Sequence, residues 1–178
     1  MSSDNKYIWY VCYGSNLAIE RLYCYFNNQA SKRLHISKGY LCPSCPNPQF
    51  ENKQFIIRHP IYFANENDYD TANWGKTGVA FLDMSKDGFA YGRAYKMTEE
   101  CFEHLRNKEG RGENWYNDPV LLGIDEDGHE IRTLTNKRRL KKKKPCDNYL
   151  EVIKIGLLEI GVSEEEANKY ISNIINDY

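Results

Sequence analysis

The feature that most constrains the fold is an apolar run that ends at a glycine turn and leads at once into a helical pattern. Residues 7–13 are β-branched and aromatic, which favours a buried strand. Gly14-Ser15-Asn16 interrupts this run, as a turn does. Apolar residues then recur at helical spacing: Ile19, Leu22, Tyr23 and Phe26. We therefore expect a strand, a tight turn and a helix, with Ser15 or Asn16 as the N-cap.

The rest of the chain predicts short strands in the middle and helices at both ends. Strand patterns occupy six segments: residues 35–40, 55–64, 77–83, 89–97, 119–124 and 130–135. Pro60 would lie at a sheet edge or bulge. Three later helices are expected, capped by Thr98, Asp147 and Ser163, and the first of them should end at Glu109-Gly110.

Hairpin-like connections dominate the middle of the chain, as at residues 125–128 between the last two strands. Such connections argue against a doubly wound fold. We predict an α+β fold for residues 1–178 as one domain. Its sheet should be small, mixed or antiparallel and β-barrel-like, with flanking helices.

The overall charge gives no reason to expect a polyanionic partner. The 178 residues include 24 basic and 25 acidic side chains, for a formal net charge of -1. Neither nucleic acid nor an anionic membrane is indicated by such a balance. The first residues are polar and no run approaches the roughly 18 apolar residues of a membrane helix. We expect a cytoplasmic protein with a small-molecule ligand.

Residues 137–144 form a basic run, with seven lysines and arginines in eight positions. Basic runs can bind RNA, which makes an RNA-binding protein an alternative function. This run contains no interleaved aromatic residue, and acidic residues elsewhere balance its charge. We expect a flexible, solvated loop near the ligand pocket.

Six cysteines are present, and in a cytosolic protein they should be reduced. Cys42 and Cys45 form the single Cys-x-x-Cys of the sequence. A structural zinc site needs about four ligands, usually supplied as two such pairs. We therefore expect two loop thiols and no bound metal.

Two segments are candidates for a functional site. In the turn at Tyr13-Gly14-Ser15-Asn16, unpaired backbone N–H groups could bind a carboxylate or an oxyanion, and Gly14 would permit positive φ. The alternative is a plain turn. Glu109 would lie at a helix C-terminus, where the helix dipole disfavours an anion. Such a placement can mark function, or Glu109 can belong to a solvated charge cluster with the nearby cations Arg106, Lys108 and Arg111.

Five motifs follow one another in a family-specific order. They are Tyr13-Gly14-Ser15-Asn16-Leu17, Gly78-Val79-Ala80-Phe81, Tyr91-Gly92, Glu109-Gly110 with Leu105 before it and Tyr116 after it, and Pro145 with Tyr149. In order and rough spacing, from about residue 7 to 171, the chain resembles the γ-glutamylcyclotransferases.

The resemblance implies a γ-glutamyl cyclotransferase-like fold and a cyclising acyltransferase or lyase. The α-amine of a γ-glutamyl compound would attack its own γ-carbonyl and release 5-oxoproline with an amine or amino acid. No metal or organic cofactor would be needed. By the same resemblance Glu109 is the general base, and the residues that bind substrate are Tyr13, Gly14, Ser15, Asn16, Leu17, Tyr116 and Tyr149.

Some features depart from the family pattern. The segment at residues 41–73 is longer than in the compact animal enzymes and is similar to a bacterial-type subgroup. The leaving amine stays open, as does the choice between monomer and homodimer. The alternative function on the same fold is a binding module for a small metabolite, without catalysis.

Overall fold

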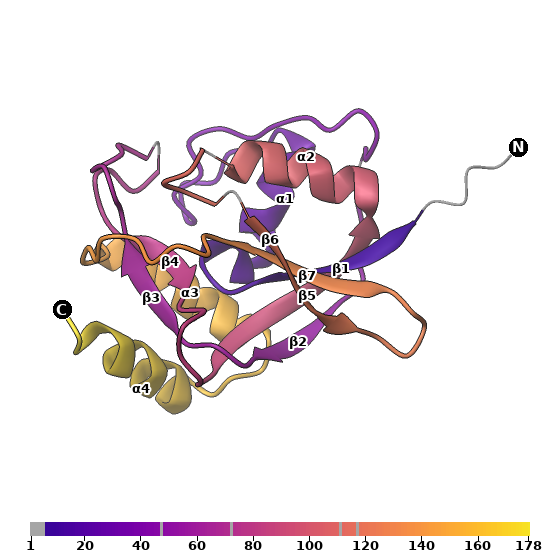
Figure 1. Cartoon of the computed structure of the whole chain (residues 1–178). Helices are drawn as coiled ribbons and strands as arrows, with labels where there is room; N and C mark the ends of the chain where they lie inside the picture. The colour runs from indigo at the N-terminus through magenta and orange to yellow at the C-terminus, as the bar shows by residue number, and fades with distance from the viewer. Residues whose placement is uncertain (1–5, 47, 72, 111, 117) are drawn as a thin grey trace, which may run out of the picture.

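The protein is built around a five-stranded mixed sheet with strand order β2-β5-β1-β7-β6 (Figure 1). The computed structural model describes residues 6–46, 48–71, 73–110, 112–116 and 118–178. The strands of this sheet are β1 (Tyr7–Cys12), β2 (Asn52–Ile57), β5 (Ala90–Thr98), β6 (Asp118–Ile124) and β7 (Glu130–Thr135). A separate two-stranded sheet pairs β3 (Ile61–Ala64) with β4 (Val79–Leu82).

The central strand β1 pairs antiparallel with β5 and parallel with β7. Its register sets Tyr7 opposite Thr98 and Trp9 opposite Ile131. The sheet is therefore mixed, and it stays open, because β2 and β6 end the strand order among the described residues. The predicted α+β class is confirmed, and the sheet does not close into the barrel that was considered.

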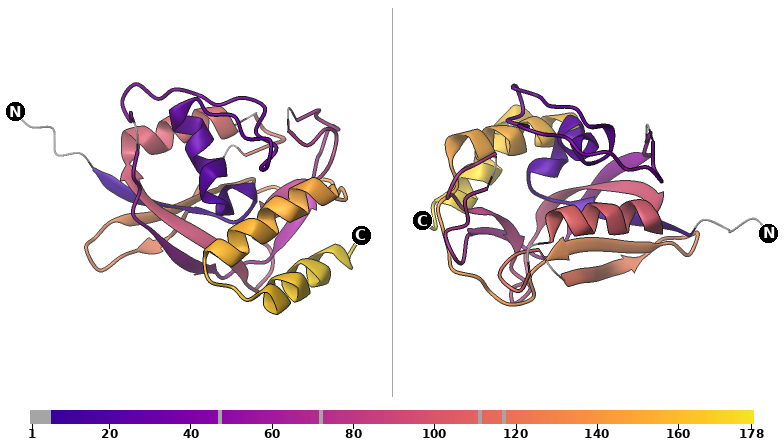
Figure 2. Two further views of the ribbon diagram at one scale, coloured as in Figure 1. Left: turned by 180° about the vertical axis from the view of Figure 1, so that it is seen from behind. Right: turned by 90° about the horizontal axis from the view of Figure 1, so that it is seen from above.

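Four α-helices cover this core: α1 (Ile19–Asn27), α2 (Glu99–Glu109), α3 (Asp147–Glu159) and α4 (Glu164–Ile175). A short 3-10 turn, η1 (Ser15–Leu17), precedes α1. Helices α1 and α2 touch through the rings of Phe26 and His104. Helices α3 and α4 are neighbours at the C-terminal side of the molecule (Figure 2). In the described ranges, none of the helices has the length and apolarity needed to cross a bilayer.

The start of α1 differs from the sequence prediction. Neither Ser15 nor Asn16 caps it, because both lie in η1, and Ala18 is the N-cap without a side-chain hydrogen bond. The free N–H of Ile19 donates instead to the Glu159 carboxylate of α3, at 2.9 Å. A residue 140 positions away thus satisfies the helix N-terminus, which local sequence rules cannot foresee.

Helix limits elsewhere follow the predicted caps closely. Thr98 accepts a hydrogen bond from the Cys101 N–H, and Ser163 accepts one from the Glu166 N–H. The cap of α3 is Cys146, so Asp147 is the first helical residue and not the predicted cap.

Two strand predictions are wrong. Residues 55–64 belong to two strands in different sheets, β2 up to Ile57 and β3 from Ile61. Pro60 lies in the break between them, because proline has no N–H to donate to a strand ladder. Residues 35–40 form no strand, only the isolated bridge between Ser31 and Ile36. His35 adopts φ 53°, a left-handed conformation that interrupts an extended chain.

Backbone hydrogen bonds join part of the basic run to neighbouring segments, while most of its side chains are exposed, as expected for a solvated loop. Lys143 N–H donates to the Phe63 carbonyl of β3 at 3.1 Å, and Gly78 N–H donates to the Lys144 carbonyl at 3.0 Å. Arg139 also forms an ion pair with Asp83 at 2.6 Å. The segment supports β3 and the approach to β4.

Cys45 and Cys101 form a disulfide, with 6.1 Å between their Cα atoms. The expectation that all six cysteines are reduced is therefore wrong for this pair, which joins the long loop before β2 to α2. Cys42 hydrogen-bonds Ser44 instead.

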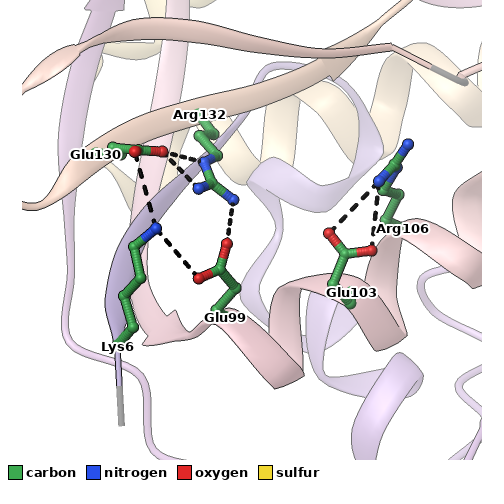
Figure 3. A network of polar contacts seen from close by, with 6 residues as sticks. All are labelled: Lys6, Glu99, Glu103, Arg106, Glu130 and Arg132. Carbon is green, nitrogen blue, oxygen red and sulfur yellow. Dashed lines mark hydrogen bonds and ion pairs between the residues drawn. The ribbon is translucent and has the colours of Figure 1, made fainter. Parts of the chain in front are cut away.

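An ion network fixes the beginning of α2 against the sheet (Figure 3). Arg132 of β7 pairs with Glu99 at 2.9 Å, and Lys6 approaches the same carboxylate at 3.3 Å. Further along the helix, Arg106 pairs with Glu103 at 3.4 Å. The network joins three elements at the same end of the sheet.

Helix α3 packs tightly on the turn that follows β1. A Cβ added to Gly156 would lie 2.3 Å from the Leu17 Cβ and 2.5 Å from the Ala18 nitrogen. Real Cβ atoms do not approach other atoms so closely. Glycine is therefore needed here for contact between helix and turn.

We expect Gly156→Ala to lower the free energy of unfolding by about 1–3 kcal/mol, because the added methyl group must push α3 away from the turn. Urea unfolding followed by circular dichroism measures the change. Gly123→Ala is the matched control, since open space surrounds a Cβ at that position in β6. Equal unfolding midpoints for the two variants would contradict this packing.

Candidate functional site

A cavity of about 250 Å³ opens beside the end of β1 and contains most of the predicted site residues. Its lining includes Tyr13, Gly14, Ser15, Asn16, Glu109, Tyr116 and Tyr149. Leu17 is the exception: it is fully buried under α3 and does not line the cavity. The structure thus brings together segments that are up to 136 residues apart, from Tyr13 to Tyr149.

Glu109 and Asn16 are joined by a hydrogen bond inside this cavity. The Asn16 side-chain amide donates to Glu109 Oε1 at 2.7 Å. Asn16 is only 5% exposed, and its Oδ1 has no hydrogen-bond partner among the described residues. One side of the cavity therefore presents a carboxylate and a neighbouring free acceptor, a pair suited to a cationic group such as an ammonium.

The predicted alternative of a solvated charge cluster at Glu109 does not match these contacts. Arg106 pairs with Glu103, and Lys108 Nζ lies 4.9 Å from the centre of the Tyr40 ring. Arg111 lies outside the described residues. Among the described residues no ion pair joins Glu109 to a cation. Its side-chain contacts are with the Asn16 amide and the Tyr25 hydroxyl.

Gly14 is required for space and not for the positive φ that the sequence suggested. Its φ is -109°, outside the left-handed region. A Cβ here would lie 2.8 Å from the Tyr149 hydroxyl and 3.4 Å from the Ala80 Cβ. The turn, α3 and β4 therefore meet at one point, and a larger residue would displace the Tyr149 side chain.

The tyrosines of the cavity are fixed by hydrogen bonds to the backbone. Tyr149 accepts from the Ala80 N–H at 3.0 Å, Tyr116 donates to the Ala80 carbonyl, and Tyr13 donates to the Leu134 carbonyl at 2.7 Å. Tyr116 also stacks on Phe81, with 4.5 Å between ring centres. These residues form rigid walls, and the hydroxyls of Tyr13 and Tyr116 donate to the protein itself.

Burial keeps these phenols neutral. Desolvation raises the pKa of Tyr149 to about 12, and it raises the pKa of Tyr13 and of Tyr116 well above the usual value. At Tyr25, burial and then the charge of Glu109 raise the pKa. The cavity walls therefore carry no phenolate charge near neutral pH.

Sequence reasoning missed Arg21, which lies in α1 and lines the cavity. The predicted core face of that helix was Ile19, Leu22, Tyr23 and Phe26. Leu22 and Phe26 are buried and the other two are half-buried, but Arg21 and Tyr25 are buried as well. Arg21 and Tyr25 lie on a second buried face of the helix, and this face lines the cavity. The apolar periodicity of the sequence does not predict it, because one of its residues is a charged arginine.

No family model matches the sequence, and no curated protein matches it. Solved structures do match. One is described as a γ-glutamyl cyclotransferase, with 21% identity, a TM-score of 0.68 and coverage of 97% of this chain and 91% of that one. An uncharacterised human protein gives 22% identity, a TM-score of 0.65 and the same coverage. YkqA from Bacillus subtilis gives 15% identity and a TM-score of 0.57, and 56% of its chain is covered.

At these identities the likeness shows the fold alone. The predicted γ-glutamyl cyclotransferase-like fold is confirmed, and the roles of the cavity residues must be argued from their geometry.

We expect protein stability to fall as pH rises from about 10 toward 12. An unfolded tyrosine ionises near pH 10, whereas Tyr149 in the folded protein holds its proton to about pH 12. The folded state therefore binds more protons in this window, and raising the pH favours unfolding. Tyrosinate absorbance at 295 nm and urea unfolding, both measured from pH 8 to 12, test this. Full tyrosine ionisation near pH 10 with the fold intact would contradict it.

Proposed function

We propose that the protein is a γ-glutamyl cyclotransferase-type enzyme, which releases 5-oxoproline and an amine or amino acid from a γ-glutamyl compound. The observation that carries the proposal is the 2.7 Å hydrogen bond between Asn16 and Glu109 within a tyrosine-walled cavity. It gives a carboxylate a fixed position beside the turn after β1. The chain also has the fold of a solved γ-glutamyl cyclotransferase.

The first step is removal of a proton. A peptide α-amine has a pKa of about 8, so it is mostly protonated at neutral pH and cannot attack. Glu109 accepts the proton, and the hydrogen bond from Asn16 to Oε1 fixes the position of the carboxylate. The free Oδ1 of Asn16 offers a second acceptor to the same nitrogen.

Ring closure follows within the one substrate molecule. The amine nitrogen bonds to the γ-carbonyl carbon, and the carbonyl oxygen takes the charge. We assign the stabilisation of that charge to the backbone N–H groups of Ser15 and Asn16, which belong to the first turn of η1. Glu109 then gives this proton to the leaving nitrogen, whose bond to carbon breaks, and accepts the second proton from the ring nitrogen. That second proton passes to the released amine, which leaves Glu109 ionised again. These steps use no metal or organic cofactor.

The rigid walls reduce the entropic cost of bringing the amine and the γ-carbonyl together. The substrate must fold so that its two ends meet, and a fixed cavity reduces the conformations open to it. Tyr149 and Tyr116 are immobilised against Ala80, and Tyr13 against Leu134. We assign these three tyrosines to substrate positioning, and Leu17 to support of the turn from beneath.

Two cations at the cavity favour an anionic leaving group. Lys38 and Lys108 are exposed and line the cavity, and their ammonium groups lie 5.8 and 4.9 Å from the centre of the Tyr40 ring. A leaving group with a carboxylate would be attracted there, whereas a polyamine would be repelled.

A binding module without catalysis remains the second candidate, since the same cavity could hold a γ-glutamyl metabolite unchanged. RNA binding is not proposed, because Arg139 and Lys143 of the basic run pair with Asp83 and Asp68. The cytoplasmic location and the bacterial-type subgroup stay predictions.

We expect Glu109→Gln to lower the rate of 5-oxoproline release by about 10²–10⁴-fold, because the amide has the same shape but cannot accept a proton. The measurement is turnover of a panel of γ-glutamyl compounds, followed by 5-oxoproline release. Glu103→Gln is the matched control, because Glu103 lies on the same helix and pairs with Arg106 away from the cavity lining. Equal rates for wild type and Glu109→Gln would remove Glu109 from the mechanism.

We also expect a preference for substrates with a charged leaving group. γ-Glutamyl-alanine should have a higher kcat/KM than γ-glutamyl-alaninamide. The two substrates share the glutamyl group, and only the alanine leaving group carries a carboxylate of its own. Exposed ion pairs are worth about 0.2–1 kcal/mol, so each lysine should contribute at most about fivefold. Replacing Lys38 and Lys108 by Gln should reduce the ratio toward one. A preference for the amide in the wild type would refute this assignment.

A further inference from the structure

Arg21 is a buried cation with unused hydrogen-bond donors. It is 4% exposed and lines the cavity, and its Nε and Nη1 have no hydrogen-bond partner among the described residues. A buried arginine is ordinarily paired, because an unsatisfied charged donor is costly. The unmade bonds therefore indicate a partner that is not part of the described protein.

Among the described residues, no carboxylate hydrogen-bonds Arg21 Nε or Nη1. Its guanidinium lies 4.9 Å from the centre of the Trp74 ring, which covers one face of the group. Its charge also acts on Cys24, Tyr25 and Tyr149. Burial raises the pKa of Cys24 to about 11 and of Tyr149 to about 12, so these groups are neutral near pH 7.

Glu109 is the one carboxylate among the described residues that line the cavity, and it accepts a hydrogen bond from the Asn16 side-chain amide. A ligand can therefore meet separate positive and negative groups in the same cavity. Arg21 provides the first, and Glu109 with the free Asn16 Oδ1 provides the second.

We infer that Arg21 binds the α-carboxylate of the γ-glutamyl group through its unpaired guanidinium donors. This inference rests on the proposed function. A guanidinium offers a carboxylate both an opposite charge and charge-assisted hydrogen bonds. Trp74 covers one face of the guanidinium, and the N–H donors in its plane remain for the ligand.

The assignment explains how the α-carbon, which bears the attacking amine, is oriented. The α-carbon of a γ-glutamyl group carries a carboxylate and an ammonium. With the carboxylate on Arg21 and the ammonium at Glu109 and Asn16, two of its substituents are fixed. The γ-carbonyl arm must then extend in one direction, and the L enantiomer is distinguished from the D enantiomer.

The product gives a test that does not depend on turnover. 5-Oxoproline keeps the carboxylate, whereas 2-pyrrolidinone is the same ring without it. Isothermal titration of the wild-type protein should detect 5-oxoproline and bind 2-pyrrolidinone at least about tenfold more weakly, as expected for loss of hydrogen bonds to a charged group. Equal affinity for the two rings, or binding of neither, would overturn the role of Arg21.

Variants then identify the residue. Arg21→Met should weaken 5-oxoproline binding about 10- to 100-fold, and Arg21→Lys should recover part of it, because it restores the charge without the planar guanidinium. Arg106→Met is the control, since Arg106 pairs with Glu103 outside the cavity lining. Folding of each variant is checked by circular dichroism. A folded Arg21→Met protein with wild-type affinity would contradict the inference.

The outcomes separate this inference from the proposed function. If 5-oxoproline binds through Arg21 but no γ-glutamyl compound is turned over, the carboxylate site stands and the enzyme proposal fails. If turnover occurs and Arg21→Met leaves KM unchanged, the enzyme proposal stands and the carboxylate site fails.

Discussion

The hydrogen bond between Asn16 and Glu109 depends on how α2 is placed against β1. Strand β5 runs antiparallel to β1 and ends with Thr98 opposite Tyr7, so α2 starts at the beginning of β1. The helix then returns along the direction of β1. Its 11 residues cover about 16 Å, and the six residues of β1 cover about 20 Å. The end of α2 therefore arrives near the end of β1, where the turn begins.

Other contacts keep this alignment in place. The ion network around Glu99 and Arg132 fixes the start of α2 (Figure 3). The Cys45–Cys101 disulfide joins the first turn of α2 to the long loop. On the other side, the absence of a side chain at Gly156 allows α3 to pack closely on the turn, and Gly14 allows the Tyr149 side chain to contact the same turn. The elements around the cavity are therefore held in place by contacts on both sides of the turn.

Much of the fold could be predicted from the sequence because its elements are marked locally. Thr98 and Gly110 delimit α2, and the acidic turn at residues 125–128 separates β6 from β7. Both candidate segments of the site, around Gly14 and at Glu109, were also visible. Their hydrogen bond joins residues 93 positions apart and is a property of the tertiary fold.

The remaining differences have the same origin. Glu159 caps α1 from a distant helix, and Arg21 is buried because a cavity lies beside it. Neither is encoded by periodicity. Gly14 was predicted for its backbone freedom, whereas its neighbours show that it is needed for close packing. Residues of the long loop lack a regular pattern, and the fold of that segment depends on contacts such as the disulfide.

The central claim is that the cavity between Glu109 and the turn at Gly14 receives the γ-glutamyl group. A crystal structure of the protein with 5-oxoproline would test it most directly. The ring should lie between Glu109 and the turn, within hydrogen-bond reach of both, with its carboxylate toward Arg21. 5-Oxoproline bound elsewhere, with this cavity empty at saturating ligand, would contradict the claim.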